Sequence, residues 1–176
     1  MTERDRFRPA LVPTGSHHRP SDLLSTAGLV APVLRPLLAA VLTRPVLAAD
    51  TGDAAQLALP GMFLGLELGE ADPGEPGGSL RPVGRVLGER LLSPPWLQPL
   101  LLLLDGVVLL DVPVPDPGEL AVALTAGARA GALEPGGLVL LAVAGPVPAG
   151  PGLAELHGPD GSSLLARIEA AAVGAA

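Results

Sequence analysis

Three aspartates surround one continuous apolar segment, Val107–Val112, and carry the first candidate chemistry in this sequence. Asp111 lies near the end of the segment, Asp105 precedes it and Asp116 follows it. Ligands of open α/β sheets bind outside the carboxyl ends of the strands, so Asp111 is placed to face a substrate. The alternative interpretation is that the three carboxylates cap and solvate the surrounding loops.

Histidine and cysteine give little support for a metal site. The chain has three histidines, His17, His18 and His157, and no cysteine. A metal site would require the histidines to converge with a carboxylate, whereas an exposed arm and one surface histidine is the simpler interpretation. Without cysteine there is no disulfide, thiolate ligand or cysteine nucleophile. No metal centre is therefore expected.

Serine and tryptophan are the remaining candidates for chemistry or binding. Ser162 and Ser163 are adjacent but lack the G-x-S-x-G setting in which a serine nucleophile is exposed beside a base, so a hydrolase is not expected. Trp96, the single tryptophan, either walls a pocket or anchors core packing. The acidic run over residues 67–75 is typical of a solvated loop.

The composition indicates one folded domain and excludes some partners. The net charge is -7 and all 11 cations are arginine, which argues against sequence-independent nucleic-acid binding because that needs a basic face. The chain has 23 glycines and 21 prolines, yet 48% of its 176 residues are hydrophobic, too many for a disordered chain. Glycine and proline cluster between the apolar segments, at 69–78, 134–137 and 145–152.

The elements that must position these residues begin after a short arm. Residues 1–20 hold four arginines and little periodic apolar signal, which predicts a flexible N-terminal arm. The remaining residues, 21–176, are expected to form a single domain. Leucines and valines recur at helical spacing over 22–43 and predict an N-terminal helical segment. Pro32 and Pro36 should kink or split that helix.

The next hundred residues alternate short apolar runs with turns. The expected elements are a first strand over 46–49, a brief helix over 54–59, a second strand over 62–68, and either a third strand or a short helix over 81–92.

The C-terminal half has the clearest pattern. A strand over 107–112, a helix that starts near Asp116 and runs to residue 133, and a strand over 138–143 predict a βαβ unit. Residues 97–104 suit a short helix, and the alternative is a hairpin that turns at Asp105-Gly106. Ser162 is expected to cap a final helix that extends to residue 172.

Two apolar stretches, 23–49 and 97–114, are long enough to be candidates for a membrane span. Two arginines and three prolines interrupt the first stretch, and two aspartates lie within the second. A charge at the bilayer centre costs roughly 2.5–3.5 kcal/mol, so neither stretch predicts a membrane helix. Residues 1–8 do not lead into the apolar run of a secretory signal. We therefore expect a cytoplasmic protein without membrane contact.

The order of these elements resembles that of class I S-adenosylmethionine-dependent methyltransferases. The segment from Asp105 to Asp111 (DGVVLLD) is similar to the fourth strand of that family, and Leu133–Gly137 (LEPGG) is similar to its L-x-P-G-G turn. The resemblance covers roughly residues 34–172. It implies an α/β, Rossmann-like fold with a mostly parallel sheet flanked by helices, here preceded by the N-terminal helical segment.

The same resemblance implies S-adenosylmethionine as the cofactor and assigns residues to it. Glu67, at the end of the second strand, would bind the ribose hydroxyls, and Glu89 would lie near the adenine. Asp50 and Gly52 would form the loop next to the methionine end, although this loop keeps one of the three glycines of the family. Asp111 would lie near the methyl acceptor.

The implied function is methyl transfer to an unidentified acceptor, with small molecules among the candidates. Methyl transfer is a direct displacement that needs mainly positioning and desolvation of the reactants, so the sequence need not contain an evident acid–base pair. The alternative is a non-catalytic, methyltransferase-like structural or interaction subunit, because the glycine loop is sparse and the sixth and seventh strands are missing. Exposed sheet edges would then contact a second copy in a homodimer or another protein partner.

Overall fold

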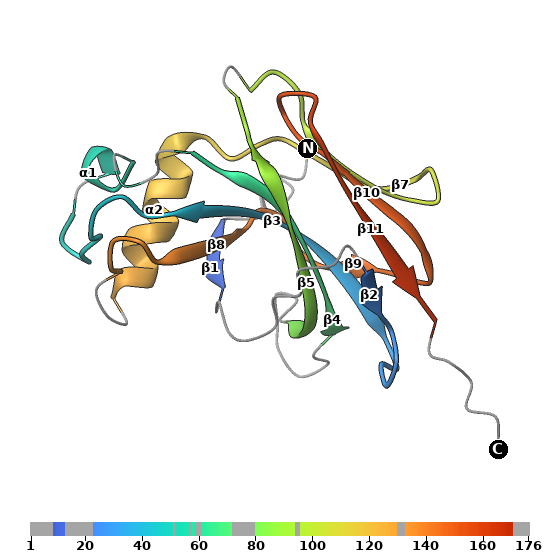
Figure 1. The fold of residues 1–176 in the computed structure, drawn as a ribbon. Helices are drawn as coiled ribbons and strands as arrows, with labels where there is room; N and C mark the ends of the chain where they lie inside the picture. The colour runs from blue at the N-terminus through green and yellow to red at the C-terminus, as the bar shows by residue number, and fades with distance from the viewer. Residues whose placement is uncertain are drawn as a thin grey trace, which may run out of the picture.

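The computed structural model describes residues 9–12, 23–50, 52–56, 58, 61–71, 80–93, 96–129 and 133–170. Within these ranges the chain forms two β-sheets and two helices (Figure 1). The predicted arm lies mostly outside the described residues, but its residues 10–12 form strand β1. No helix in the described ranges is long and apolar enough to cross a membrane.

The larger sheet, called sheet A here, is antiparallel in every pairing described. Its strand order is β1-β8-β3-β4-β5, and β9 pairs with part of β3. The strands are β1 (Ala10–Val12), β3 (Pro32–Val41), β4 (Phe63–Ala71), β5 (Leu80–Leu91), β8 (Leu138–Ala142) and β9 (Val147–Pro148).

The smaller sheet, sheet B, has the order β2-β11-β10-β6-β7. The strands are β2 (Leu23–Ser25), β6 (Leu100–Leu104), β7 (Val107–Val112), β10 (Gly152–His157) and β11 (Ser163–Glu169). The β2–β11 pairing is parallel, and the other pairings described in this sheet are antiparallel.

A tight turn joins β6 to β7. Asp105 and Gly106 both have positive φ, of 50° and 76°, and a two-residue turn with this handedness matches the twist of a β-hairpin. The structure thus confirms the hairpin alternative, and the short helix predicted over 97–104 is wrong.

Two helices, α1 (Gly52–Gln56) and α2 (Pro117–Ala128), lie together beside sheet A (Figure 1). Helix α2 begins where the sequence predicts. The Asp116 side chain accepts a hydrogen bond from the Glu119 backbone N–H, and the Glu119 side chain accepts one from the Asp116 N–H. This capping box satisfies two N–H groups that would otherwise lack partners.

The predicted Rossmann-like parallel sheet is wrong. The three elements of the expected βαβ unit exist as β7, α2 and β8, but β7 belongs to sheet B and β8 to sheet A. A continuous apolar run is typical of a strand covered on both faces. It does not indicate which sheet contains that strand, so the βαβ prediction could not be made from it alone. In β7 the run has a different origin, because the strand lies at a sheet edge and Val107 and Val108 are exposed.

The predicted N-terminal helical segment is also wrong, since residues 22–43 contain β2 and β3. Strand β3 is covered on both faces: Leu34 and Leu38 join the core between the layers, whereas Leu37 and Ala39 join a second cluster on the opposite face. A strand buried on both faces is apolar at nearly every position, so it also satisfies a helical spacing.

Pro36 lies inside β3 without removing a ladder hydrogen bond. On one side of β3 the pairing with β9 ends at Leu34 and the pairing with β8 begins at Leu37. The Pro36 carbonyl accepts a hydrogen bond from the Val143 N–H on that side. Because the N and C=O of one strand residue point the same way, the missing N–H of Pro36 falls in the gap between the two partners.

The other elements divide between confirmed and wrong predictions. The strand predicted over 62–68 is β4, and the ambiguous segment 81–92 is a strand, β5. The final helix predicted over 162–172 is wrong, because its described part contains β11. The first strand predicted over 46–49 is reduced to one isolated bridge, between Val46 and Leu133.

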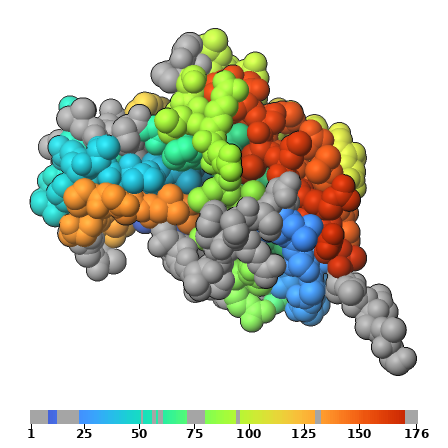
Figure 2. Space-filling view, in the orientation of Figure 1, coloured from blue at the N-terminus to red at the C-terminus, as the bar shows by residue number. Residues whose placement is uncertain are grey.

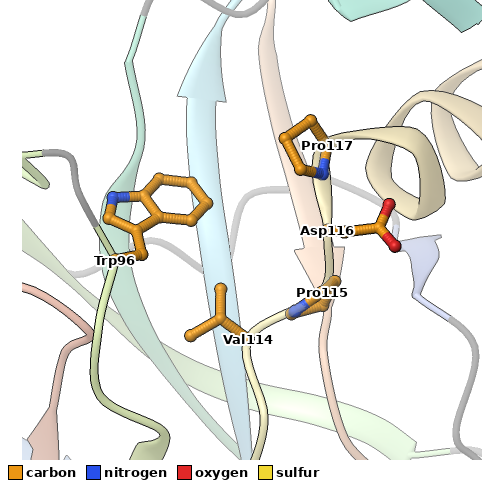
Figure 3. A pocket seen from close by; sticks show the side chains of 5 residues that line it. All are labelled: Trp96, Val114, Pro115, Asp116 and Pro117. Atoms are coloured by element: carbon orange, nitrogen blue, oxygen red, sulfur yellow. The ribbon is translucent and has the colours of Figure 1, made fainter.

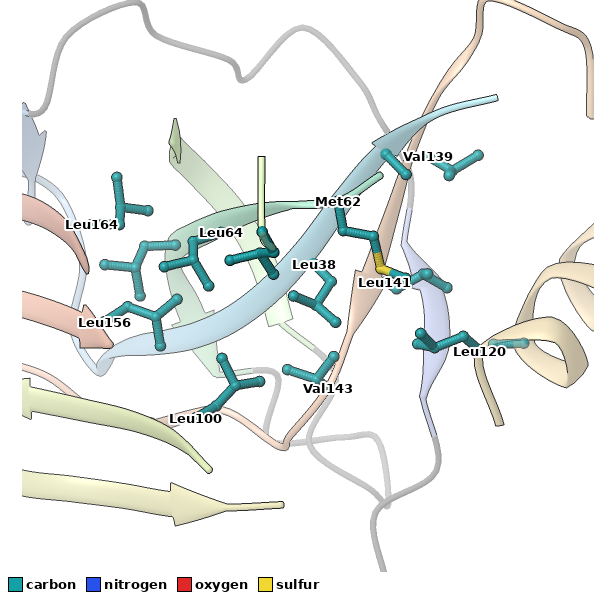
Figure 4. Close-up of a cluster of buried hydrophobic side chains, with 14 of the residues drawn as sticks. Leu38, Met62, Leu64, Leu100, Leu120, Val139, Leu141, Val143, Leu156 and Leu164 are labelled. Atoms are coloured by element: carbon teal, nitrogen blue, oxygen red, sulfur yellow. The ribbon is translucent and has the colours of Figure 1, made fainter. Parts of the chain in front are cut away.

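The main hydrophobic core fills the space between the layers (Figure 4). Leu38 and Leu64 of sheet A face Leu100 and Leu156 of sheet B, while Leu120 of α2 packs beside the β8 end of sheet A. One face of sheet A is therefore covered partly by sheet B and partly by the helices. A second, smaller cluster lies on the outer face of sheet A, with Val12, Leu37, Ala39, Leu140 and Ala142 buried in it.

Candidate functional site

A cavity of about 440 Å³ lies where the chain passes from β7 to α2 (Figure 3). The described residues that line it are Trp96, Val114, Pro115, Asp116 and Pro117. We call it the Trp96 pocket. Its volume is in the range of small-molecule sites, roughly 300–1,000 Å³.

One wall of the Trp96 pocket is stiffened by alternating prolines. The sequence from Pro113 to Pro117 is PVPDP, so every residue in it is either a proline or precedes one. Proline fixes its own φ and holds the preceding residue extended. Asp116 accordingly has φ -70° and ψ 160°, and this wall is therefore formed before any ligand binds.

The opposite wall is the indole of Trp96. In Figure 3 the six-membered ring points across the cavity toward Val114 and Pro117. Trp96 and Val114 also pack against the main core. Both interpretations from the sequence therefore hold: this tryptophan anchors packing and walls a pocket.

Asp116 is the one carboxylate among the described lining residues of the Trp96 pocket, and it is already engaged. The Asp116 side chain points toward α2 and away from Trp96 (Figure 3) and caps the helix through the Glu119 N–H at 2.9 Å. The surface presented to a ligand is thus mainly aromatic and aliphatic.

Glu67 lies away from this pocket, in a buried row of charges on sheet A. Arg35 of β3, Glu67 of β4 and Arg85 of β5 are cross-strand neighbours. The Arg35 Nε donates to Glu67 Oε2 at 3.0 Å, and Arg85 donates to Oε1. The side chains of Glu67 and Arg85 are 0% and 1% exposed, and that of Arg35 is 12% exposed. Both carboxylate oxygens are therefore occupied by guanidinium groups.

Asp50 and Gly52 form local structure near α1. Asp50 closes a turn by accepting a hydrogen bond from the Leu47 N–H at 2.9 Å, and it lies 3.5 Å from the Arg44 guanidinium. Gly52 is the exposed first residue of α1. Neither residue lines the Trp96 pocket.

Glu89 and Asp111 are exposed on strands of different sheets. Glu89 lies near the end of β5, four residues beyond Arg85, and Asp111 lies on β7 opposite Leu101. The five predicted site residues thus occupy β4, β5, β7, α1 and the turn before α1. That any of them binds a ligand remains a prediction.

Sequence reasoning missed a cluster of Ser163, His157 and Glu155 on sheet B. The Ser163 Oγ lies 2.8 Å from His157 Nδ1, and His157 Nε2 lies 3.6 Å from Glu155 Oε2. Strands β10 and β11 pair so that His157 is directly opposite Ser163. The turn sequence Gly158-Pro159-Asp160-Gly161 between two alternating segments was the signal that could have predicted this hairpin.

No protein-family model matches the sequence, and no curated protein matches it. Solved structures do match in fold. A 5-carboxymethyl-2-hydroxymuconate delta-isomerase from Mycobacterium smegmatis has a TM-score of 0.64 at 18% identity, over 85% of this chain and 63% of its own. A 4-oxalocrotonate decarboxylase from Pseudomonas putida G7 has a TM-score of 0.62 at 16% identity, over 84% and 63%. A structure assigned to the fumarylacetoacetate hydrolase family, from Yersinia pestis CO92, has a TM-score of 0.62 at 14% identity, over 88% and 82%.

The decarboxylase was solved with calcium and acetate and with magnesium and adipate, which raises the question of a divalent cation in this chain. Such cations prefer several carboxylate oxygens. Among the described residues no three His, Asp or Glu side chains group as a metal site would require, and Glu67 is already paired with two arginines. The described residues therefore do not fit a divalent cation, while His17 and His18 lie outside them.

These likenesses overturn the resemblance to methyltransferases. A mostly antiparallel two-sheet fold has no parallel Rossmann sheet to hold S-adenosylmethionine, so that cofactor, methyl transfer and the methyltransferase-like non-catalytic alternative are all wrong. The chain spans 63% of the isomerase and decarboxylase chains. The chain therefore shares its fold with solved structures that include an isomerase, a decarboxylase and a protein of the fumarylacetoacetate hydrolase family.

Proposed function

We propose that the chain binds a small unsaturated carboxylic acid in the Trp96 pocket. The observation that carries this proposal is the preformed, largely apolar cavity of about 440 Å³. The fold supports the choice of ligand class, because the matched enzymes include a hydroxymuconate isomerase and an oxalocrotonate decarboxylase. We extend the proposal to a reaction on the bound acid. This extension is an analogy with the matched enzymes, which share the fold.

The distribution of charge determines how such an acid lies in the pocket. The acidic groups at the α2 end, Asp116 and Glu119, repel a carboxylate. The hydrocarbon part of the ligand therefore faces Trp96 and the prolines, and its carboxylate faces the solvent. Affinity should then rise with the apolar length of the ligand, by about fourfold for each buried methylene at about 0.8 kcal/mol.

Trp96 provides the assay. The chain has one tryptophan and no tyrosine, so its near-ultraviolet fluorescence reports on the pocket. Titration with acetate, butyrate and hexanoate should change the emission, with affinity increasing in that order. Calorimetry with 2-hydroxyhepta-2,4-diene-1,7-dioate then tests the unsaturated class, whose absorbance interferes with fluorescence.

A filled-pocket variant and a distant control complete the test. Val114→Phe should weaken binding at least tenfold because the added ring occupies the cavity, whereas Leu153→Ala on sheet B should leave affinity unchanged. If none of these acids binds at millimolar concentration, or if Val114→Phe binds as tightly as the unchanged chain, the proposal is wrong.

Association with a second copy is the second candidate, favoured by the exposed edge of sheet B. β7 is the last described strand of that sheet, and it exposes Val107 and Val108 without the lysine or proline that discourages edge pairing. Antiparallel pairing of two β7 strands would continue the sheet across a two-fold axis. Sedimentation should then show a dimer that Val108→Lys dissociates, and a monomer at all accessible concentrations contradicts this candidate.

A further inference from the structure

We propose that Ser163 is a nucleophile, activated by His157 and positioned through Glu155, that accepts the acyl group of short aliphatic esters. This site is distinct from the Trp96 pocket, and the inference does not depend on the acid-binding function. It rests on the hydrogen bond of 2.8 Å between Ser163 Oγ and His157 Nδ1. A nucleophile and a base within hydrogen-bond reach, with a third group that orients the base, form the usual arrangement for covalent catalysis.

The neighbouring carboxylate gives the imidazole the required tautomer. Glu155 Oε2 lies 3.6 Å from His157 Nε2, and a carboxylate there favours the hydrogen on Nε2. The Nδ1 lone pair is then directed at the Ser163 hydroxyl and can accept its proton. The 3.6 Å separation is longer than a hydrogen bond, and catalytic contacts of this kind often shorten only in the complex with substrate.

The hairpin that carries the pair is fixed at its turn. Asp160 accepts hydrogen bonds from the Ser162 N–H at 3.0 Å and from the Ser93 N–H at 2.9 Å, outside the hairpin. The Pro159 carbonyl also accepts hydrogen bonds from the N–H groups of residues 97 and 98. Ser163 therefore follows a turn that is tied to the rest of the fold, which anchors the backbone from which its side chain extends.

The surroundings of the cluster define the substrate class. His157 is flanked across the sheet by Leu101, and Glu155 is flanked by Leu103 on one side and Leu165 on the other. Leu165 is exposed and the other two leucines are half-buried. Atoms of β10 and β11 lie at the surface in Figure 2, in orange and red. An aliphatic acyl chain can therefore lie on these leucines beside the serine, while the leaving group faces the solvent.

The reaction has two balanced steps. In the first, Ser163 Oγ bonds to the carbonyl carbon, the hydroxyl proton passes to His157 Nδ1, and the bond to the alkoxide breaks. The alkoxide takes the proton from His157 and leaves as the alcohol. In the second, His157 removes a proton from water, the water oxygen attacks the acyl group, and Ser163 Oγ leaves with the proton. The sum is ester plus water giving acid plus alcohol.

The test uses an alkyl fluorophosphonate and the full chain. In labelling, the Ser163 Oγ–P bond forms while the hydroxyl proton passes to His157 Nδ1, the P–F bond breaks, and fluoride leaves. We expect one adduct, located at Ser163 by peptide mass spectrometry, together with a burst of nitrophenolate from p-nitrophenyl butyrate. Ser163→Ala should abolish both signals. His157→Gln should slow labelling about 100-fold, within the range of general-base effects.

Further variants separate reactivity from structure. Glu155→Gln should slow labelling while Glu155→Asp restores it in part, because Glu155 acts through the imidazole. Ser25→Ala, on β2 of the same sheet, is the matched control and should label like the unchanged chain. The proposal is overturned if no adduct forms, if the adduct lies on another serine, or if His157→Gln labels at an unchanged rate. The His157→Gln result decides the matter even if Ser163→Ala fails to fold.

Discussion

Replacing Glu67 with glutamine should destabilise the fold strongly, because the change leaves Arg35 and Arg85 without the carboxylate that they share. Glu67 and Arg85 are almost completely buried and Arg35 is 12% exposed. Removing one partner of a buried ion pair costs about 3–5 kcal/mol. Since Arg35 retains some contact with solvent, we expect a loss at the lower end, about 3 kcal/mol in the free energy of unfolding.

Denaturation in guanidinium chloride, followed by far-ultraviolet circular dichroism, measures this loss. Glu89→Gln is the matched control, because Glu89 is exposed on β5 and its replacement should change stability by less than about 0.5 kcal/mol. A loss below about 1 kcal/mol in Glu67→Gln would show that the arginines are solvated well enough without the carboxylate, and would refute this reasoning.

A triple variant tests the same reasoning from the opposite direction. Arg35→Met, Glu67→Leu and Arg85→Met together remove all three charges and keep most of the volume. Such replacements of buried ion groups are often neutral or stabilising by about 1–4 kcal/mol. We expect the triple variant to be clearly more stable than Glu67→Gln. Equal instability of the two would assign the cost to packing rather than to buried charge.

Three further changes should affect stability through backbone packing, helix capping and pH. Gly69→Ala would place a Cβ atom 2.3 Å from the Arg81 carbonyl oxygen, so thermal unfolding should show a loss of about 1–3 kcal/mol, whereas Gly145→Ala meets no atom within 4 Å and is the control. Asp116→Ala removes the cap of α2 and should cost about 1 kcal/mol in chemical denaturation. For Asp160, burial by itself raises the pKa, but hydrogen bonds from nearby side-chain and backbone donors and an arginine charge outweigh it and lower the pKa from 3.8 to about 2. Because the folded pKa is depressed, this stabilisation is present above pH 3.8 and is lost as the pH falls toward 2. The stability difference between the unchanged chain and Asp160→Asn, about 1 kcal/mol after solvent screening, should therefore shrink as the pH falls below 3.8 and vanish in acid denaturation below pH 2.

Residues that act within one turn allowed local structure to be predicted from the sequence. The pairing partners of the strands could not be predicted, because they lie far away along the chain. The start of α2 was correct because Asp116, Pro117 and Glu119 act within one turn of helix. The turn at Asp105-Gly106 was available as an alternative for the same reason. By contrast, the pairing of β8 with β3 joins residues about a hundred positions apart, and a run of leucines does not encode which distant strand it meets.

In the candidate sites, too, the local features were predictable from the sequence and the contacts between strands were not. The sequence leaves Trp96 as either a pocket wall or a packing anchor, and the proline series opposite it would have indicated a rigid second wall. Ser163 was set aside because no base adjoins it in sequence. The base lies six residues earlier and reaches it across the hairpin. A prediction of that hairpin from its Pro-Asp-Gly turn was the missing step.

The outer faces of the two sheets differ in how accessible their charged and polar groups are. On sheet A the outer face carries a buried apolar cluster and the Arg35–Glu67–Arg85 row, in which Glu67 and Arg85 are almost completely buried. On sheet B the outer face leaves His157 37% and Glu155 28% exposed. Groups that act on a ligand must be accessible to it, whereas substitutions at half-exposed positions usually change stability little. Variants that lose reactivity at unchanged stability should therefore map to the outer face of sheet B, and variants of the charged row on sheet A should lose stability first.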